Sequence, residues 1–159
     1  MRLFTMVRLG DLESKDLLDE DINVKDDGEN SLMMYAAYYG HPNIVEMLIG
    51  RDKRTIWDRS KIGNSSLMMT CSKNIPCVKL LLETKWLVTS RSQYSALYYA
   101  AMDDFKKGVQ LLLSTSLIKN SCGYTAYDRA SVEIKLTFDL YWKKTKAVQP
   151  ILPLTLISL

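Results

Sequence analysis

Short runs of small and apolar residues alternate with polar turns, and this alternation recurs along most of the chain. It is clearest in GENSLMMYAAYYGHPNIVEMLI (residues 28–49), GNSSLMMTCSKNIPCVKLLL (63–82) and QYSALYYAAMDDFKKGVQLLL (93–113). A further copy, GYTAYDRAS, begins at Gly123 and fades, and a degenerate copy covers residues 3–21. Such internal repetition predicts an array of small stacked units.

Each unit is predicted to form two short helices joined by polar turns. The first helix opens at a Ser or Thr, whose side chain can accept a hydrogen bond from an unpaired helical N–H. These openings are 30 residues apart from Ser65 to Ser95 and again from Ser95 to Thr125. The second helix carries an apolar run, such as residues 109–113, which suits a helix packed between neighbours. Glycines in the turns supply the positive φ that tight turns require.

These residues resemble the ankyrin-repeat family. The family pattern is Gly-x-Thr-Pro-Leu-His-x-Ala-Ala-x-x-Gly-His, then a short spacer and Val-x-Leu-Leu-Leu. The best local match is YAAYYGH at residues 35–41, followed by VEMLI at 45–49. Leu-Met or Leu-Tyr replaces Leu-His, and Ser-Ala or Thr-Ala replaces Thr-Pro, a variant similar to the ankyrin arrays of protists. The resemblance covers residues 3–131 and implies an all-α solenoid of stacked helix-turn-helix units with short hairpin-like connections.

The connections depart from the family pattern. The segment 28–47 is one residue longer than the family spacing, and the segment 63–80 is one residue shorter. The glycine that usually ends the second helix is absent after Leu82 and Leu113. We therefore expect short or irregular hairpins in the later units, whereas the apolar residues of the helical stack are kept.

The pattern changes after Ser131. Residues 133–142 are expected to form a last helix that caps the stack, so the ankyrin domain is predicted to span residues 1–142, with about four repeats plus terminal caps. A basic and then apolar tail follows at 143–159, and its apolar run, 151–159, is too short to cross a membrane. Packing on the last repeat, or a frayed or truncated end, is favoured over contact with an anionic membrane.

The composition of the chain indicates the cellular compartment and the class of partner to expect. Hydrophobic residues make up 47% of the chain and the net charge is +3, which suits a globular domain and is too weakly basic to imply a nucleic-acid partner. The N-terminus lacks the apolar run of a signal peptide, and Met1 suggests a true start. The cysteines, Cys71, Cys77 and Cys122, match no disulfide framework. We therefore expect a cytoplasmic, monomeric protein with free thiols.

The sequence contains few residues in patterns typical of catalytic or metal-binding sites. The single histidine, His41, lies where the family places a structural histidine, and one His with three scattered Cys is a poor supply of zinc ligands. No nucleotide-binding, metalloprotease, nucleophile-elbow or kinase motif occurs. We expect no enzyme activity, cofactor or metal. An acidic group is expected to form a solvated face, although a paired acid and base is imaginable there: Asp16, Asp19, Glu20, Asp21, Asp26 and Asp27.

Tyrosines supply the candidate binding surface, because a tyrosine offers a large, stiff contact area with a polar tip. The resemblance implies that the first helix of each unit lines a concave face and that this face and the hairpin tips bind a partner protein. The candidate partner-binding residues are Glu29, Tyr35, Tyr38, Tyr39, Asn64, Ser72, Lys73, Tyr94, Tyr99, Met102, Asp103 and Tyr124.

Burial is expected to separate binding residues from packing residues. Tyr98, which takes the place of the family's histidine, is expected to pack between repeats. The tyrosines expected at the surface are Tyr35, Tyr38, Tyr39 and Tyr99. The methionines expected in the core, where their flexibility fills irregular gaps, are Met33, Met34, Met68 and Met69.

The resulting hypothesis is a non-catalytic adaptor that binds a partner protein. One alternative is the regulatory or targeting arm of a larger enzyme, such as a protein kinase that carries ankyrin repeats. Another is a membrane-peripheral scaffold that acts through the tail.

Overall fold

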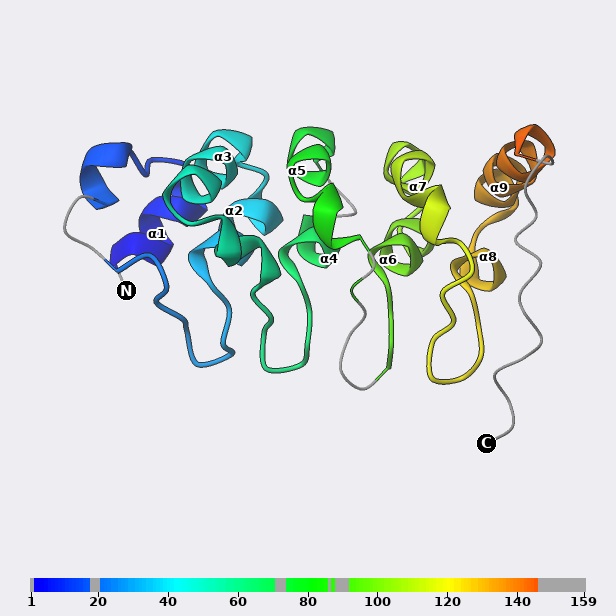
Figure 1. Ribbon diagram of the computed structural model, residues 1–159, viewed down its shortest axis with the longest axis horizontal. Helices are drawn as coiled ribbons and strands as arrows, with labels where there is room; N and C mark the ends of the chain where they lie inside the picture. Colours follow the sequence, from blue (N-terminus) through cyan, green and yellow to red (C-terminus); the bar gives the residue numbers. More distant parts are fainter. Residues whose placement is uncertain (1, 18–20, 71–73, 86, 88–91, 146–159) are drawn as a thin grey trace.

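The computed structural model describes residues 2–17, 21–70, 74–85, 87 and 92–145. Their helices form two stacked rows that follow the chain from one end of the molecule to the other (Figure 1). The inner row consists of α1 (Arg2–Leu9), α2 (Leu32–Tyr39), α4 (Ser66–Thr70), α6 (Ala96–Met102) and α8 (Ala126–Arg129). The outer row consists of α3 (Pro42–Arg51), α5 (Ile75–Leu80), α7 (Lys106–Leu112) and α9 (Val132–Lys144).

Short 3₁₀ helices follow some of these helices in the chain. They are η1 (Ser14–Leu17) after α1, η2 (Lys53–Trp57) after α3, η3 (Leu82–Thr84) after α5 and η4 (Leu113–Thr115) after α7. Each helix contacts its neighbours in its own row, as α2 does with α1 and α4, and inner helices α2, α4, α6 and α8 also contact the outer helix that follows them. In the described residues β-pairing is limited to isolated antiparallel bridges at the bases of two connections. The predicted all-α solenoid of helix-turn-helix units is confirmed.

The predicted caps explain where most inner helices begin. The Ser95 hydroxyl accepts a hydrogen bond of 3.2 Å from the backbone N–H of Tyr98, and Ser65 caps α4 through the N–H of Met68 in the same way. At α8 the Asp128 carboxylate accepts hydrogen bonds from both the backbone N–H and the hydroxyl of Thr125. Ser31 opens α2 without such a bond. Satisfying an otherwise unpaired helical N–H stabilises each short helix by about 1 kcal/mol.

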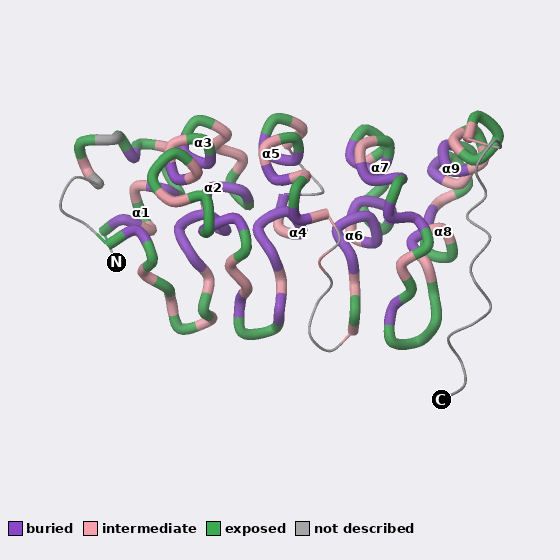
Figure 2. Tube along the Cα trace, viewed as in Figure 1, coloured by how far each residue is buried: buried purple, intermediate pink, exposed green. Residues whose placement is uncertain are grey.

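The apolar core lies between the two rows and repeats from unit to unit (Figure 2). Alanine pairs at 36–37 and 100–101 are buried and allow the inner helices to approach closely. Two positions at the outer helices are filled by fully buried side chains in three successive units: Val45, Val78 and Val109 at one, and Leu48, Leu81 and Leu112 at the other. Burial of each such leucine contributes about 1.5–3 kcal/mol. The stack is therefore held by contacts between neighbouring units.

The outer helices, and not the hairpins, account for the shorter later units. Pro42, the first residue of α3, precedes Ser60 of the next turn by 18 residues, whereas Lys106 of α7 precedes the equivalent Asn120 by 14. The offset from the serine that opens an inner helix to the residue before the outer helix changes little: it is ten residues from Ser31 to His41 and from Ser95 to Phe105, and nine from Ser65 to Asn74. The expectation of shortened hairpins is wrong for the fourth turn, which has the same hydrogen bonds as the first two.

Buried threonines replace the missing glycine at the ends of the outer helices. The hydroxyl of Thr84 donates a hydrogen bond of 2.9 Å to the carbonyl oxygen of Leu81, and Thr115 donates one of 2.8 Å to that of Leu112. Thr55 does the same to Asp52. Helix-terminal carbonyls lack intrahelical donors. The hydroxyls satisfy them, so the helices end without a left-handed glycine.

The last described helix, α9, packs against α7 and α8. Ser131 caps α9 by accepting a hydrogen bond from the N–H of Ile134, and the buried ring of Phe138 packs against Tyr127 and Trp142. Because α9 continues to Lys144, it passes the proposed boundary at residue 142, and the division into domain and tail stays a prediction. Within the described ranges, every helix is too short or too polar to cross a membrane.

Candidate functional site

The connections between units extend from the inner row as fingers, and three of their turns share one geometry (Figure 1). In the turns 26–30, 60–64 and 120–124, the N–H of the first residue donates to the carbonyl oxygen of the fifth. The side chain of the first residue (Asp26, Ser60 or Asn120) accepts a hydrogen bond from the backbone N–H of the fifth. These side chains fix the finger tips relative to the inner helices that follow.

The fourth position of each turn has a left-handed backbone. Gly63 and Gly123 hold it with φ of 83°, and Glu29 holds it in the first finger with φ of 58°. Gln93, with φ of 53°, has the same offset from the serine that opens the next inner helix. The left-handed position of the first finger is therefore Glu29 and not Gly28, which explains why spacing counted from Gly28 was one residue too long.

Hydrogen bonds join neighbouring fingers to one another. The N–H of Lys61 donates to the carbonyl oxygen of Gly28 at 2.8 Å, and the N–H of Ser121 donates to that of Ser92 at 3.0 Å. An ion pair of 3.6 Å between Lys25 and Asp58 adds a second link between the first two fingers. The first finger is thus joined to the second, and the third to the fourth, which suits a preorganised binding surface.

Asp26 connects the first finger to the first candidate tyrosine. Its carboxylate accepts hydrogen bonds from Gly28 and Asn30, and its Oδ2 accepts one of 2.9 Å from the Tyr35 hydroxyl. Partial burial raises the pKa of Asp26, but the hydrogen bonds from Asn30, Tyr35 and Gly28 outweigh it and hold the pKa below its ordinary value. The hydrogen bond to Asp26, together with burial, raises the pKa of Tyr35.

A hollow of about 200 Å³ lies between α2 and α4, and its lining includes Met34, Tyr35, Tyr38, Tyr39 and Met69. The rings of the three tyrosines form a continuous group, with centroids 6.1 Å apart for Tyr35 and Tyr39 and 5.0 Å apart for Tyr38 and Tyr39. Tyr38 and Tyr39 are 44% and 42% exposed. The hollow therefore combines an apolar interior with accessible aromatic walls.

A second tyrosine group lies on α6. The Tyr94 ring stacks on Tyr98 with centroids 4.5 Å apart, and its edge approaches Tyr99. The Tyr99 hydroxyl reaches back to the amide oxygen of Asn64 in the preceding finger at 3.5 Å, the limit of a hydrogen bond. Among the described residues, the ring contacts of this group stay separate from those of Tyr35, Tyr38 and Tyr39.

Burial bears out part of the expected division. Tyr98 is buried, as predicted, and Tyr38 and Tyr39 are exposed, as predicted. The expected exposure of Tyr35 and Tyr99 is wrong: both are half-buried, because their rings pack on aromatic neighbours and their hydroxyls bond to finger residues. Of the methionines expected in the core, Met69 is half-buried at the hollow, whereas the others are buried: Met33, Met34 and Met68.

The other candidate residues lie at the fingers and along the inner row. Asn64 and Tyr94 are half-buried, and the exposed ones are Glu29, Met102, Asp103 and Tyr124. Ser72 and Lys73 lie outside the described residues. Met102 and Asp103 follow Ser95 by the same offsets at which Tyr38 and Tyr39 follow Ser31, so the same surface positions carry different chemistry in the two units.

Sequence reasoning missed Asn30, Met34 and Met69 as hollow-lining residues. Alignment on the helix-opening serines contains a signal for two of them. Asn30 immediately precedes Ser31, as the chosen Asn64 precedes Ser65, and Met69 follows Ser65 by the same four residues that separate Tyr35 from Ser31. Met34 gave no such signal, because it is a buried core residue that also lines the hollow.

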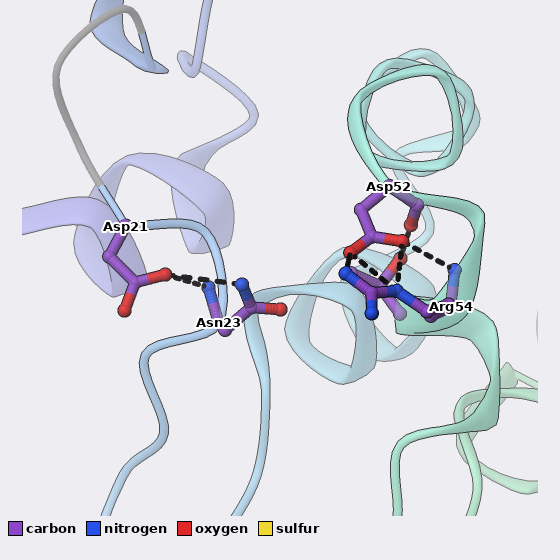
Figure 3. Close-up of polar contacts among 5 residues, drawn as sticks. Asp21, Asn23, Asp52 and Arg54 are labelled. Carbon is purple, nitrogen blue, oxygen red and sulfur yellow. Dashed lines mark hydrogen bonds and ion pairs between the residues drawn. The ribbon is translucent and has the colours of Figure 1, made fainter.

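Several of the described carboxylates accept hydrogen bonds within turns. Asp21 accepts hydrogen bonds from the backbone and side-chain amides of Asn23, and Asp52 accepts three from the Arg54 guanidinium, the shortest 2.7 Å (Figure 3). The Arg54 side chain holds the pKa of Asp52 below its ordinary value. Asp16 similarly accepts the N–H of Glu13. These bonds give the carboxylates turn-forming roles; of the predicted acidic group, Asp19 and Glu20 lie outside the described residues.

The remaining reactive groups are integrated into the packing. The His41 ring lies against Gly10, and its Nε2 is 3.2 Å from the carbonyl oxygen of Arg8, which agrees with a structural role. Cys77 is a buried free thiol whose burial raises its pKa to about 11, so it is protonated at neutral pH. Cys122 is free and exposed. In the described part of the chain, His, Cys, Asp and Glu side chains form no group of three or more that could hold a metal ion.

Comparison with protein families decides the identity of this array. A family model described as ankyrin repeats (3 copies) matches residues 34–122, more than half of the chain. The chain belongs to the ankyrin-repeat family. A comparison with curated proteins finds none that matches. The matched range runs from α2 into the fourth finger, and the ankyrin stack continues beyond it through α1 on one side and α8 and α9 on the other.

Ankyrin repeats are protein–protein interaction modules with a non-catalytic fold. In this ankyrin array the exposed positions include the finger tips and the outward positions of the inner helices. The structure places Tyr38, Tyr39, Met102 and Asp103 at such helix positions, and Glu29 and Tyr124 at fingers.

Proposed function

We propose that this ankyrin-repeat chain is a non-catalytic cytoplasmic adaptor that binds a partner protein through its inner helices and finger tips. The observation that carries the proposal is the hollow between α2 and α4, where Tyr38 and Tyr39 stand exposed beside the apolar Met34 and Met69. Exposed aromatic side chains around an apolar depression are typical of the residues that contribute most to binding free energy.

The dimensions of the hollow suit one anchoring side chain of the partner. Its volume of about 200 Å³ exceeds the roughly 150 Å³ of an apolar cavity that accommodates benzene. A leucine, methionine or phenylalanine of the partner would fill it and remove water from the tyrosine rings. Asp26 and Asn30 hold Tyr35 at the rim, so little ordering of this wall is needed on binding.

The test is affinity purification with quantitative mass spectrometry on the unaltered chain and on Tyr38→Ala plus Tyr39→Ala. Loss of two such contacts is expected to weaken partner binding about tenfold or more, because aromatic anchors contribute above 1 kcal/mol each. A matched control is Trp57→Ala plus Leu117→Ala, which removes two comparably exposed apolar side chains, one at the end of η2 and one in the connection that follows η4.

The proposal requires a protein that is depleted in the tyrosine double variant and retained in the control, while far-ultraviolet circular dichroism of both variants stays unchanged. Equal recovery of every bound protein from the unaltered chain and from the tyrosine variant would remove this surface from the binding site.

A further inference from the structure

A second and larger hollow lies between the outer helices α7 and α9. These helices belong to the row away from the fingers (Figure 1). It has a volume of about 390 Å³. Its apolar lining includes Leu113 at the end of α7 and Leu136, Leu140 and Tyr141 on α9. We call it the α7–α9 groove.

Helix α9 presents two apolar faces, and the described structure covers only one of them. Ile134 and Phe138 are buried against the inner row. Leu136 and Leu140, one helical turn apart, remain 58% and 59% exposed along the groove. Full burial of a leucine contributes about 1.5–3 kcal/mol, so two half-exposed leucines lining one groove leave substantial burial unused. The groove is therefore a candidate docking site for an apolar segment.

The chain leaves the described structure at this groove. Lys144 lines the groove, and Thr145 is the last described residue. At the other end, the ion pair of 2.8 Å between Lys106 and Glu133 borders it. From Lys144 back to Glu133 the helix axis covers about 17 Å. Nine extended residues span about 30 Å, so the segment 151–159 is long enough to run the full length of the groove after the chain reverses.

The sequence of that segment fits an apolar groove. From Ala147 to Leu159 the chain carries no charged side chain. Leu152, Leu154 and Leu156 alternate with other residues, which would place them on one side of an extended chain at intervals of about 6.7 Å. Residues four apart on a helix, as Leu136 and Leu140 are, repeat at about 6 Å. The two apolar series therefore match in spacing, and Pro153 has no N–H that burial would leave unpaired.

We propose that the segment 151–159 folds back along α9 and occupies the α7–α9 groove, with Leu154 and Leu156 against Leu136 and Leu140. The groove is more than twice the roughly 150 Å³ of a cavity that accommodates benzene, so it takes two or more leucine side chains. Covalent attachment beside the groove gives the segment an effective concentration in about the millimolar range, ahead of any separate chain. The proposal does not rest on the proposed function, because it concerns the opposite row of helices.

The test is a double-mutant cycle on the full chain. Leu136→Ser plus Leu140→Ser changes the groove, and Leu154→Ser plus Leu156→Ser changes the segment. If the segment occupies the groove, each pair lowers the folding equilibrium constant about tenfold or more, and all four substitutions together lower it little further. Val132→Ser is the matched control, because Val132 is 79% exposed on the same helix and does not line the groove; its effect and that of the segment pair add.

Three outcomes overturn the proposal. The segment substitutions leave stability unchanged, or their effect simply adds to that of the groove substitutions, or the coupling depends on protein concentration and so reports a second copy of the chain. An independent measurement uses methyl-labelled leucines in the unaltered chain at a concentration where it is monomeric. Magnetisation transfer between tail methyl groups and those of Leu136 or Leu140 supports the contact, and its absence contradicts it.

Discussion

The side-chain amide of Asn74 donates a hydrogen bond of 3.0 Å to the carbonyl oxygen of Gly40, 34 residues earlier. The same side chain caps α5, since its Oδ1 accepts the N–H of Cys77 at 3.0 Å. His41 holds the equivalent position before α3, and its Nε2 lies 3.2 Å from the carbonyl oxygen of Arg8 in the unit before. In these two units the residue before the outer helix thus also ties its unit to the end of the inner helix in the unit before.

We predict that Asn74→Ala lowers the free energy of unfolding by about 2 kcal/mol, because it removes a helix cap of about 1 kcal/mol and an inter-unit hydrogen bond of similar worth. Asn74→Ser keeps a capping oxygen but is too short to reach Gly40, so it is expected to lose about half as much. Urea unfolding followed by circular dichroism measures both. Equal losses in the two variants would show that the bond to Gly40 contributes nothing.

One substitution, glycine to alanine, is predicted to have opposite effects at two sites. Gly123 has φ of 83° and open space around its Cα, so Gly123→Ala is expected to lower stability by about 1 kcal/mol through backbone strain alone. Gly50 lies in α3, also with open space, and Gly50→Ala is expected to raise stability by up to about 1 kcal/mol through helix propensity. Thermal and urea unfolding of both variants measures the signs.

The reverse substitution checks the same cause in the first finger. Glu29 holds a left-handed φ of 58° at the position equivalent to Gly123. Because glycine adopts this conformation without strain, Glu29→Gly is expected to raise the free energy of unfolding by less than about 1 kcal/mol. A loss of stability in Glu29→Gly would mean that the carboxylate makes a contribution that outweighs the backbone.

We predict that ionisation of Asp26 makes the free energy of unfolding depend on pH in the acidic range. Since the folded pKa of Asp26 lies below its unfolded value of about 3.9, its contribution is present above that pH and is lost as pH falls through the folded pKa. Asp26→Asn removes the charge and keeps one accepting oxygen. The stability difference between the unaltered chain and Asp26→Asn is therefore expected to be constant from about pH 5 to 7 and to shrink below about pH 4.

Urea unfolding at a series of pH values measures this difference. The other carboxylates with a lowered pKa, Asp52 and Asp128, are present in both chains and cancel from the comparison. A difference that persists undiminished to pH 3 would contradict the role given to the Asp26 carboxylate.

Much of the fold follows from short-range pattern. The serines and threonine before α2, α4, α6 and α8, the alanine pairs and the recurring valine and leucine positions are local features, because helix starts and buried stripes depend on residues a few positions apart. For the same reason Tyr98 could be assigned to packing from its place in the repeat. The left-handed residue of the first finger could not be located from Gly28, because a left-handed φ leaves no mark on the sequence when Glu29 adopts it.

The candidate surface was only partly accessible to such reasoning. The exposure of Tyr38 and Tyr39 follows from their register on α2. The half-burial of Tyr35 depends on Phe4, 31 residues earlier, and on Asp26 in the adjoining finger, and that of Tyr99 depends in part on Asn64, which lies 35 residues before it. Contacts between different units require the stacking geometry, which no single repeat contains.

The repeating pattern is enough to specify a stack of helix pairs, because each pair has more apolar surface than it can bury alone and the same pattern recurs along the chain. Tertiary structure decided which positions become surface: the α2–α4 hollow, the joined fingers and the α7–α9 groove all lie between units, where the spacing of neighbouring helices sets the space that is left. The cause is the sequence separation of the interacting residues. A periodic sequence specifies each unit through residues a few positions apart, and only the packed array brings residues some 30 positions apart into contact.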